Sequence, residues 1–187
     1  MITQRNETIK YMARRSIKKW EIQFKCVKLM MDAMDSLTSK EEIKAYSVMM
    51  RNPLVFDNNV ADVHNLIPYT LSGVEDKTTE DHLIGMSNIV LYIYENGLHR
   101  KWKTVKDFMN TLKALNTLIP VTKHMNNSKI FKEGWQFESD NISECLNWNE
   151  KLKSVGVKEL TCNKTGVIKS VDTVWDEWYE GNKKYLV

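Results

Sequence analysis

An aspartate and a histidine stand side by side in the first half of the chain, after a stretch that favours a turn. Asp81 and His82 follow Gly73 and precede an apolar run. A carboxylate can hold a divalent cation, and a neighbouring imidazole, whose ordinary pKa is near neutrality, can take a proton from water. This pair of side chains suits metal-assisted hydrolysis of a phosphodiester.

A second polar stretch, residues 121–130, follows Pro120. Asn126 and Asn127 carry amide oxygens, which are hard ligands that suit Mg²⁺ or a similar ion such as Mn²⁺. Lys123 and Lys129 flank the two asparagines and could hold a phosphate. The stretch therefore offers the groups that a metal-dependent site on nucleic acid would use.

Taken together, the Asp-His step and the later Val-Thr-x-x-x-Asn step resemble phage HNH endonucleases of the ββα-metal group, over about residues 70–132. The resemblance implies that Asp81 is a metal ligand, His82 the general base and Asn126 the second ligand, with Asn127 replacing it if the register differs by one. It also implies Mg²⁺ or Mn²⁺ as cofactor and DNA as partner. In that family the histidine lies on a strand of a hairpin, whereas the residues here predict the first turn of a helix.

Each of these residues also has a purely structural interpretation. Asp81 can complement a helix dipole, which leaves His82 as a partly exposed helix residue. Asn126 and Asn127 can serve a turn or a helix N-cap.

Cations surround an aromatic side chain in the segment from His99 to Lys106. The candidate phosphate-binding residues there are Arg100, Lys101, Lys103 and Lys106. The cationic side chains can bind a phosphate backbone while the indole of Trp102 stacks on a base. In the alternative, Trp102 anchors the segment in the core and the lysines are solvated.

The periodicity of apolar residues predicts a mainly α fold, a helical domain with a long N-terminal amphipathic helix and one small β-hairpin near the C-terminus. The expected helices span about Glu7–Met34, Ser39–Arg51, His82–Glu95, Thr104–Leu118, Asn141–Ser154 and Val171–Glu180. Three of their starts carry capping signals, which are Ser39 with Glu42, Thr104 with Asp107, and Thr78–Thr79 followed by Glu80 and Asp81. Residues 66–71 are expected to be extended, and residues 157–170 to form the hairpin around Asn-Lys-Thr-Gly. We expect one domain over residues 1–187. The alternative is a division into an N-terminal helical region (residues 1–66) and a core (residues 67–187).

Charge is unevenly distributed along the 187 residues, although the net charge is only +3. Residues 1–35 carry 8 Lys/Arg against 4 Asp/Glu, residues 40–95 carry 4 against 9, and residues 97–135 carry 8 against 2. Two basic segments therefore flank an acidic one. This pattern favours a polyanion as partner, and solvated helix faces are the alternative.

The composition excludes several classes of protein. The N-terminus has no signal-peptide pattern and no apolar run is long enough for a membrane span, so we expect no membrane association and a cytoplasmic location, the host cytoplasm if a phage encodes the chain. The abundant lysine and asparagine are typical of AT-rich genomes such as those of many phages. Three widely spaced cysteines exclude a zinc ribbon. Phosphate-loop, Rossmann, zincin and hydrolase motifs are absent from the sequence.

Three functions follow in order of preference. The first is a metal-dependent DNA endonuclease of the phage HNH type. The second is a non-enzymatic helical protein that binds DNA, or that binds and inhibits a host protein. The third is a virion or assembly component, for which a stable homo-oligomer, such as a homodimer, would be the first sign.

Overall fold

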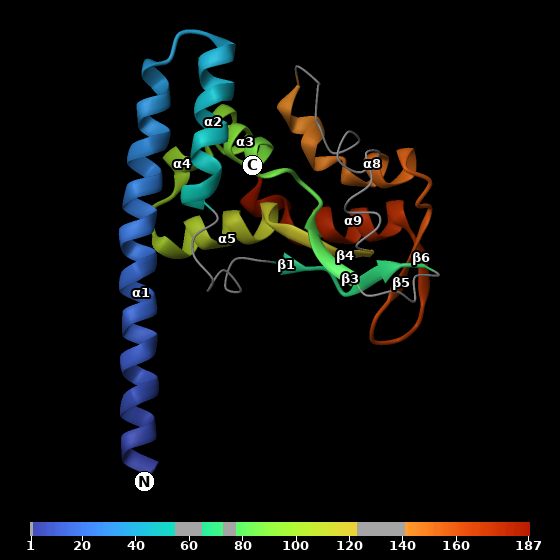
Figure 1. The fold of residues 1–187 in the computed structure, drawn as a ribbon, viewed down its shortest axis with the longest axis horizontal. Helices are drawn as coiled ribbons and strands as arrows, with labels where there is room; N and C mark the ends of the chain where they lie inside the picture. The colour runs from blue at the N-terminus through green and yellow to red at the C-terminus, as the bar shows by residue number, and fades with distance from the viewer. Residues whose placement is uncertain (1, 55–64, 73–77, 123–140) are drawn as a thin grey trace.

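The computed structural model describes residues 2–54, 65–72, 78–122 and 141–187, with side chains in the first helix described from Lys18 onward. The described chain is mainly α-helical and carries two small sheets (Figure 1). The helices are α1 Ile2–Ala33, α2 Lys40–Leu54, α3 Met86–Glu95, α4 Leu98–Lys101, α5 Val105–Leu115, α8 Trp148–Ser154 and α9 Val171–Asn182, with the short 3₁₀ turns η1 Met34–Ser36, η3 Ile142–Leu146 and η4 Lys183–Tyr185. Among the described helices, none combines the length and apolar composition that a bilayer crossing requires.

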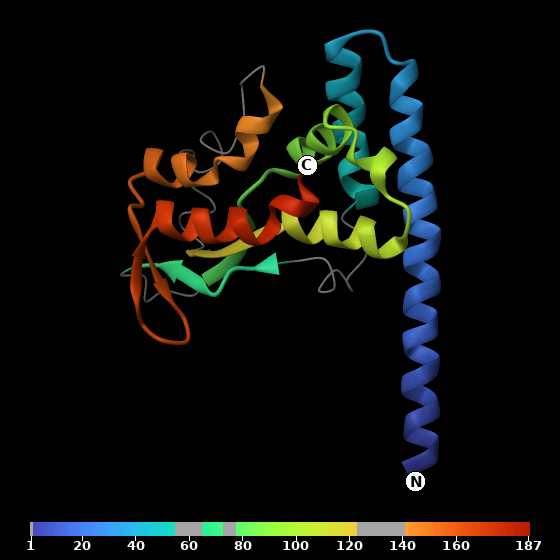
Figure 2. The same cartoon turned by 180° about the vertical axis from the view of Figure 1, so that it is seen from behind.

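The long helix α1 packs against α2, α4 and α5. The buried side chains of this region include Trp20, Val27 and Met31 of α1 and Met34 of the turn η1. The N-terminal half of α1 extends past the rest of the protein in every view (Figures 1 and 2). Only the C-terminal half of this helix therefore belongs to the packed body.

The loop after α1 ends in a capping box that begins α2. The Ser39 hydroxyl accepts a hydrogen bond from the Glu42 N–H at 3.1 Å, and the Glu42 carboxylate accepts one from the Ser39 N–H at 3.0 Å. These reciprocal bonds satisfy orphan donors of the first turn. The helix continues through Pro53 to Leu54, beyond the end near Arg51 that the sequence predicts.

The first sheet has the strand order β1–β4–β3, with β1 Asn65–Leu66, β3 Thr78–His82 and β4 Thr117–Thr122. Strand β4 lies in the centre, parallel to β1 and antiparallel to β3. Two sequence predictions are wrong here. Residues 78–82 form a strand rather than a helix start, and α3 begins only at Met86. Helix α5 ends at Leu115, before a strand that includes Pro120.

Pairing explains both corrections. All five residues of β3 pair with β4, and its two threonines have a branched Cβ that favours strands. Pro120 cannot donate a hydrogen bond, but β1 pairs only with Thr117 and Leu118. The side of β4 that faces β1 is therefore unpaired at Pro120 within the described residues, and proline is tolerated there.

The second sheet joins β2 Tyr69–Leu71, β5 Glu159–Cys162 and β6 Ile168–Ser170, all antiparallel, in the order β2–β5–β6. Gly166 has φ 69° in the turn between β5 and β6, a conformation that glycine adopts without steric cost. The pairing of β2 with β5 links segments about 90 residues apart. The sequence does not predict that pairing.

The C-terminal helix α9 contacts helix α8 and the central strand β4. Trp178 of α9 packs edge-on against Trp148 of α8, and its indole N–H donates to the Thr117 hydroxyl of β4 at 2.8 Å. Figure 2 shows α9 and α5 in line beside the strands, and the turn η4 contacts both helices. The end of the chain is therefore built into the same core as α5.

Candidate nucleic-acid interface

Asp81 and His82 are consecutive residues of strand β3, opposite Ile119 and Leu118 of β4. Both side chains are half-buried, and the Asp81 carboxylate accepts a hydrogen bond from the His82 backbone N–H at 2.8 Å. Burial raises the pKa of Asp81, and that hydrogen bond partly offsets the effect. Successive strand residues point to opposite faces of a sheet, so the two side chains diverge.

The remaining residues of the predicted metal site lie outside the described residues. These are Asn126, its substitute Asn127, and the lysines Lys123 and Lys129. Strand β4 ends at Thr122 opposite Thr78, which is the end of β3 away from His82. Within the described ranges, no three His, Cys, Asp or Glu side chains are grouped so that they could hold a metal ion.

The predicted basic segment forms α4 and the start of α5. Lys101, Lys103 and Lys106 are exposed, as phosphate-binding residues would need to be. Arg100 differs from them, because its guanidinium lies 2.6 Å from the Asp35 carboxylate of η1. His99 is fully buried. The segment therefore offers three exposed ammonium groups and one guanidinium that is already paired.

Trp102 lies in the core rather than on the surface. Its exposed fraction is 3%, and its ring packs 5.0 Å from Phe108 and 6.4 Å from Phe24 of α1. The indole N–H donates to the Thr111 hydroxyl at 3.0 Å. This indole cannot stack on a base. Its role is to fix the backbone on either side, where Lys101 and Lys103 lie.

The capping box at Thr104 and Asp107 sets the direction of α5. The Thr104 hydroxyl accepts from the Asp107 N–H at 3.2 Å, and the Asp107 carboxylate accepts from the Thr104 N–H at 2.9 Å. The hydrogen bond with the Thr104 side chain is the main reason that the pKa of Asp107 is lowered. The sequence predicts this cap, and it orients Lys106 on the first turn.

Helix α1 brings its own lysines beside α4. Phe24, Lys28 and Asp32 are spaced by four residues, so they share one face of the helix. Phe24 contacts Trp102, and Asp32 lies 3.8 Å from the Nε2 of His99. Lys28, between them, therefore faces α4, and the exposed Lys25 lies on the same flank.

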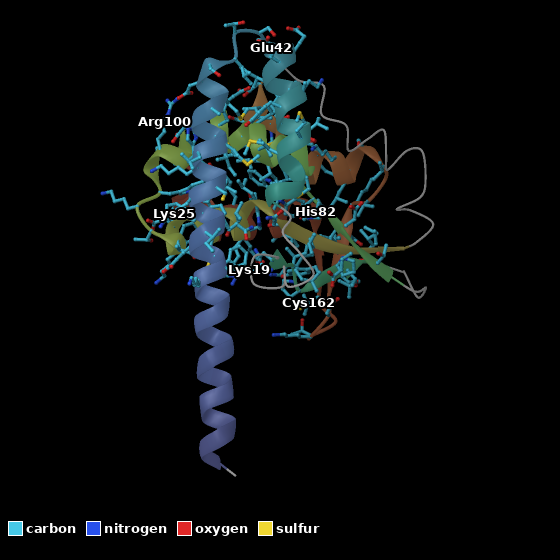
Figure 3. The ribbon with its side chains drawn as sticks, turned by 60° about the vertical axis from the view of Figure 1, so that its left-hand side comes forward. Lys19, Lys25, Glu42, His82, Arg100 and Cys162 are labelled. Carbon is cyan, nitrogen blue, oxygen red and sulfur yellow. The ribbon has the colours of Figure 1, made fainter. Side chains whose placement is uncertain are left out.

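Lys25, Lys28, Lys101, Lys103 and Lys106 together form what we call the α1/α4/α5 basic surface. Figure 3 shows Lys25 and Arg100 on the same side of the molecule, with His82 on the other side of α1 in that view. Two basic segments that are distant in the sequence are thus adjacent in space.

A buried histidine fixes the contact between α1 and α4. The His99 ring stacks on Tyr94, with 5.9 Å between centroids and 14° between planes. The single O–H of Tyr94 is shared between the Asp35 carboxylate at 3.1 Å and the Met34 carbonyl at 3.2 Å. Burial is the main cause that lowers the pKa of His99. The imidazole is therefore mostly neutral at pH 7 and acts as a structural side chain.

The sequence did not identify the acidic partners Asp32 and Asp35. It also did not identify Lys184 and Tyr185 of η4 as candidate functional residues. The partners lie on α1 and η1, more than 60 residues from α4. No local pattern marks such pairs, because they depend on how α1 docks.

No family model, no curated protein and no solved structure matches this chain.

Proposed function

We propose that this protein binds DNA through the α1/α4/α5 basic surface. The observation that carries the proposal is the contact of Phe24 with Trp102, which places the lysines of α1 beside those of α4 and α5. Phosphate contacts by clustered lysines supply most of the sequence-independent affinity for DNA. A surface of this composition is therefore suited to the phosphate backbone.

The availability of these cations supports the proposal. None of the ion pairs among the described residues involves Lys25, Lys101 or Lys106. Other lysines of the described chain are neutralised within the fold, as Lys153 is by Glu150 and Asp172. Free ammonium groups on one flank create a positive potential that attracts a polyanion.

The test is binding of a labelled DNA duplex, measured by fluorescence anisotropy over a series of salt concentrations. The triple variant Lys101→Gln, Lys103→Gln, Lys106→Gln is compared with the triple variant Lys44→Gln, Lys158→Gln, Lys164→Gln. The control removes the same charge from exposed lysines of α2 and of the segments flanking β5. We expect the first variant to lose most of its affinity and the control to keep it. Equal losses would attribute binding to net charge and contradict the proposal.

A metal-dependent DNA endonuclease remains the second candidate function. The observation that favours it is the position of His82 on a strand of an antiparallel pair, because the HNH-type endonucleases that the sequence resembles also carry their histidine on a hairpin strand. In this candidate, Asp81 and Asn126 would bind Mg²⁺ or Mn²⁺, and His82 would take the proton from water. Residues 123–140 would have to supply the remaining metal ligand.

Nicking of supercoiled plasmid with and without Mn²⁺ tests the second candidate. His82→Gln and Asn126→Ala are run beside Glu80→Gln, a change at the exposed neighbour on β3. Metal-dependent nicking that disappears in the first two variants and survives in the control would support this function. Absence of nicking in every protein, with DNA binding intact, would leave only the binding function.

A further inference from the structure

A pocket of about 160 Å³ opens where α4, α5 and the C-terminal turn η4 meet. Lys101 lines it, so the pocket adjoins the α1/α4/α5 basic surface. Lys184 and Tyr185 of η4 form the opposite side. Neither the predicted nuclease site nor the basic surface uses these two residues.

The walls of the pocket are held in place by buried contacts. Leu98 and Trp102 are almost completely buried, and the Trp102 indole is bonded to Thr111, which also lines the pocket. Across the opening, the turn η4 is fixed because the Tyr92 hydroxyl of α3 donates to the Leu186 carbonyl at 2.9 Å. A ligand would therefore meet a preformed site, and little ordering would be needed on binding.

The lining combines two cations with an aromatic ring. Lys101 and Lys184 are exposed, and the Lys184 ammonium lies 4.9 Å from the centroid of the half-buried Tyr185 ring. Ammonium groups bind phosphate oxygens, and an aromatic ring stacks on a nucleobase. The Lys184 ammonium and the Tyr185 ring belong to consecutive residues of η4. Together they suit a ligand in which a phosphate is linked to a planar ring.

Asp107 adds a carboxylate to the same lining. Its Oδ2 accepts hydrogen bonds from the N–H groups of Lys103 at 3.0 Å and Thr104 at 2.9 Å, and its pKa is lowered. An ionised carboxylate repels a phosphate but accepts a hydrogen bond from an amino group. Such a group is present on the edges of adenine, cytosine and guanine.

The volume limits the ligand to a small portion of a nucleic acid. Pockets for drug-sized ligands begin at about 300 Å³, so a space of about 160 Å³ admits one base and not a base pair. A base inside a duplex is stacked and paired, and its removal from the stack is unfavourable. The pocket therefore favours a nucleotide that is already unpaired.

We infer that this pocket takes one unpaired nucleotide of the bound DNA, with its base against Tyr185 and its flanking phosphates on Lys101 and Lys184. The inference rests on the proposed DNA-binding function and names its substrate class. The protein thus binds single-stranded DNA, or DNA with an unpaired end, more tightly than a blunt duplex.

Anisotropy with a labelled single strand and with a blunt duplex of the same sequence tests this inference. We expect tighter binding of the single strand by the wild-type protein. Tyr185→Leu removes the ring and should weaken single-strand binding by about tenfold while the duplex affinity is unchanged. Tyr185→Phe keeps the ring and should restore the preference.

Adjacent lysines provide the matched control. Lys184→Gln should weaken single-strand binding, whereas Lys183→Gln should not, because Lys183 pairs with Glu180 and does not line the pocket. If Tyr185→Leu fails to fold, as judged by its thermal melt, the lysine pair still carries the test. Duplex binding without a preference for the single strand, or a preference that Lys184→Gln leaves intact, would overturn this inference alone. Binding of neither DNA would overturn the proposed function as well.

Discussion

The Nε2 of His99 lies 3.8 Å from the Asp32 carboxylate, across the contact between α4 and α1. The imidazole is fully buried, whereas the aspartate side chain is 49% exposed. Burial disfavours the imidazolium form and lowers the pKa of His99, and it outweighs the opposite effects of the hydrogen bond with the Ile93 carbonyl and of the Asp32 and Asp35 carboxylates. Attachment of the long helix is therefore linked to the protonation of one side chain.

This linkage predicts a loss of stability as the pH falls. The pKa of His99 in the folded protein lies below its ordinary value of 6.5, so the unfolded chain takes up the proton first. The free energy of unfolding should decrease once the pH falls below about 6.5 and level off below the folded pKa. Urea unfolding at several pH values measures it. His99→Gln should show a flatter dependence, and an unchanged dependence would contradict the role of His99.

The hydrogen bond from Trp102 to Thr111 should contribute measurably to the stability. Thr111→Val leaves the buried indole N–H without its acceptor, which we expect to cost about 1–3 kcal/mol. Thr111→Ser keeps the hydroxyl and should cost less. Chemical denaturation of the three proteins provides the comparison, and a larger loss in Thr111→Ser than in Thr111→Val would show that packing of the methyl group matters more than the hydrogen bond.

The cap of α5 gives a third prediction. Thr104→Ala removes the oxygen that accepts the Asp107 N–H, and loss of such a cap costs about 1 kcal/mol. Thr104→Ser should restore most of that stability. The midpoint of thermal unfolding reports the difference, and a stable alanine variant would mean that packing alone holds the start of α5.

Salt dependence distinguishes phosphate contacts from other forms of DNA binding. Each phosphate contact contributes about 0.9 to the slope of log affinity against log salt concentration. The variant lacking Lys101, Lys103 and Lys106 should therefore have a slope shallower by up to about 2.7. If the variant binds more weakly but its plot has the same slope as that of the wild type, these lysines do not contact phosphates.

Arg100 should behave differently from the lysines around it. Its pair with Asp35 is exposed on both sides, so Arg100→Gln should cost no more than about 1 kcal/mol of stability. DNA affinity should fall less than in Lys101→Gln, because the guanidinium already has a carboxylate partner. Anisotropy of the two single variants tests this order, and a larger loss with Arg100→Gln would reverse it.

Local signals in the sequence are sufficient for the caps and for much of the helical framework. The pairs Ser39–Glu42 and Thr104–Asp107 act within one turn, and the structure contains both capping boxes. The helix predicted at Asp81 is wrong because a threonine pair followed by acidic residues also matches a helix start. The strand forms because its partner Ile119 comes 38 positions later, and no local pattern contains that information.

In the candidate interface, too, some features could be predicted from local sequence and others depend on distant contacts. The cluster of lysines in residues 101–106 is visible in the sequence itself. The location of Lys25 beside them depends on how α1 packs against α4 and α5. The pocket at Tyr185 also depends on distant contacts, since Tyr92 holds η4 in place from 94 positions away. Asn126 lies outside the described residues, so the predicted metal site stays a prediction.

The projection of α1 beyond the body has a hydrodynamic consequence. Trp20 contacts Phe108 of α5, and the helix continues from there back to Ile2 (Figure 1). At about 1.5 Å per residue, this arm is roughly 27 Å long. A molecule with such an arm tumbles and sediments more slowly than a sphere of equal mass, so its frictional ratio should exceed that of a compact globule.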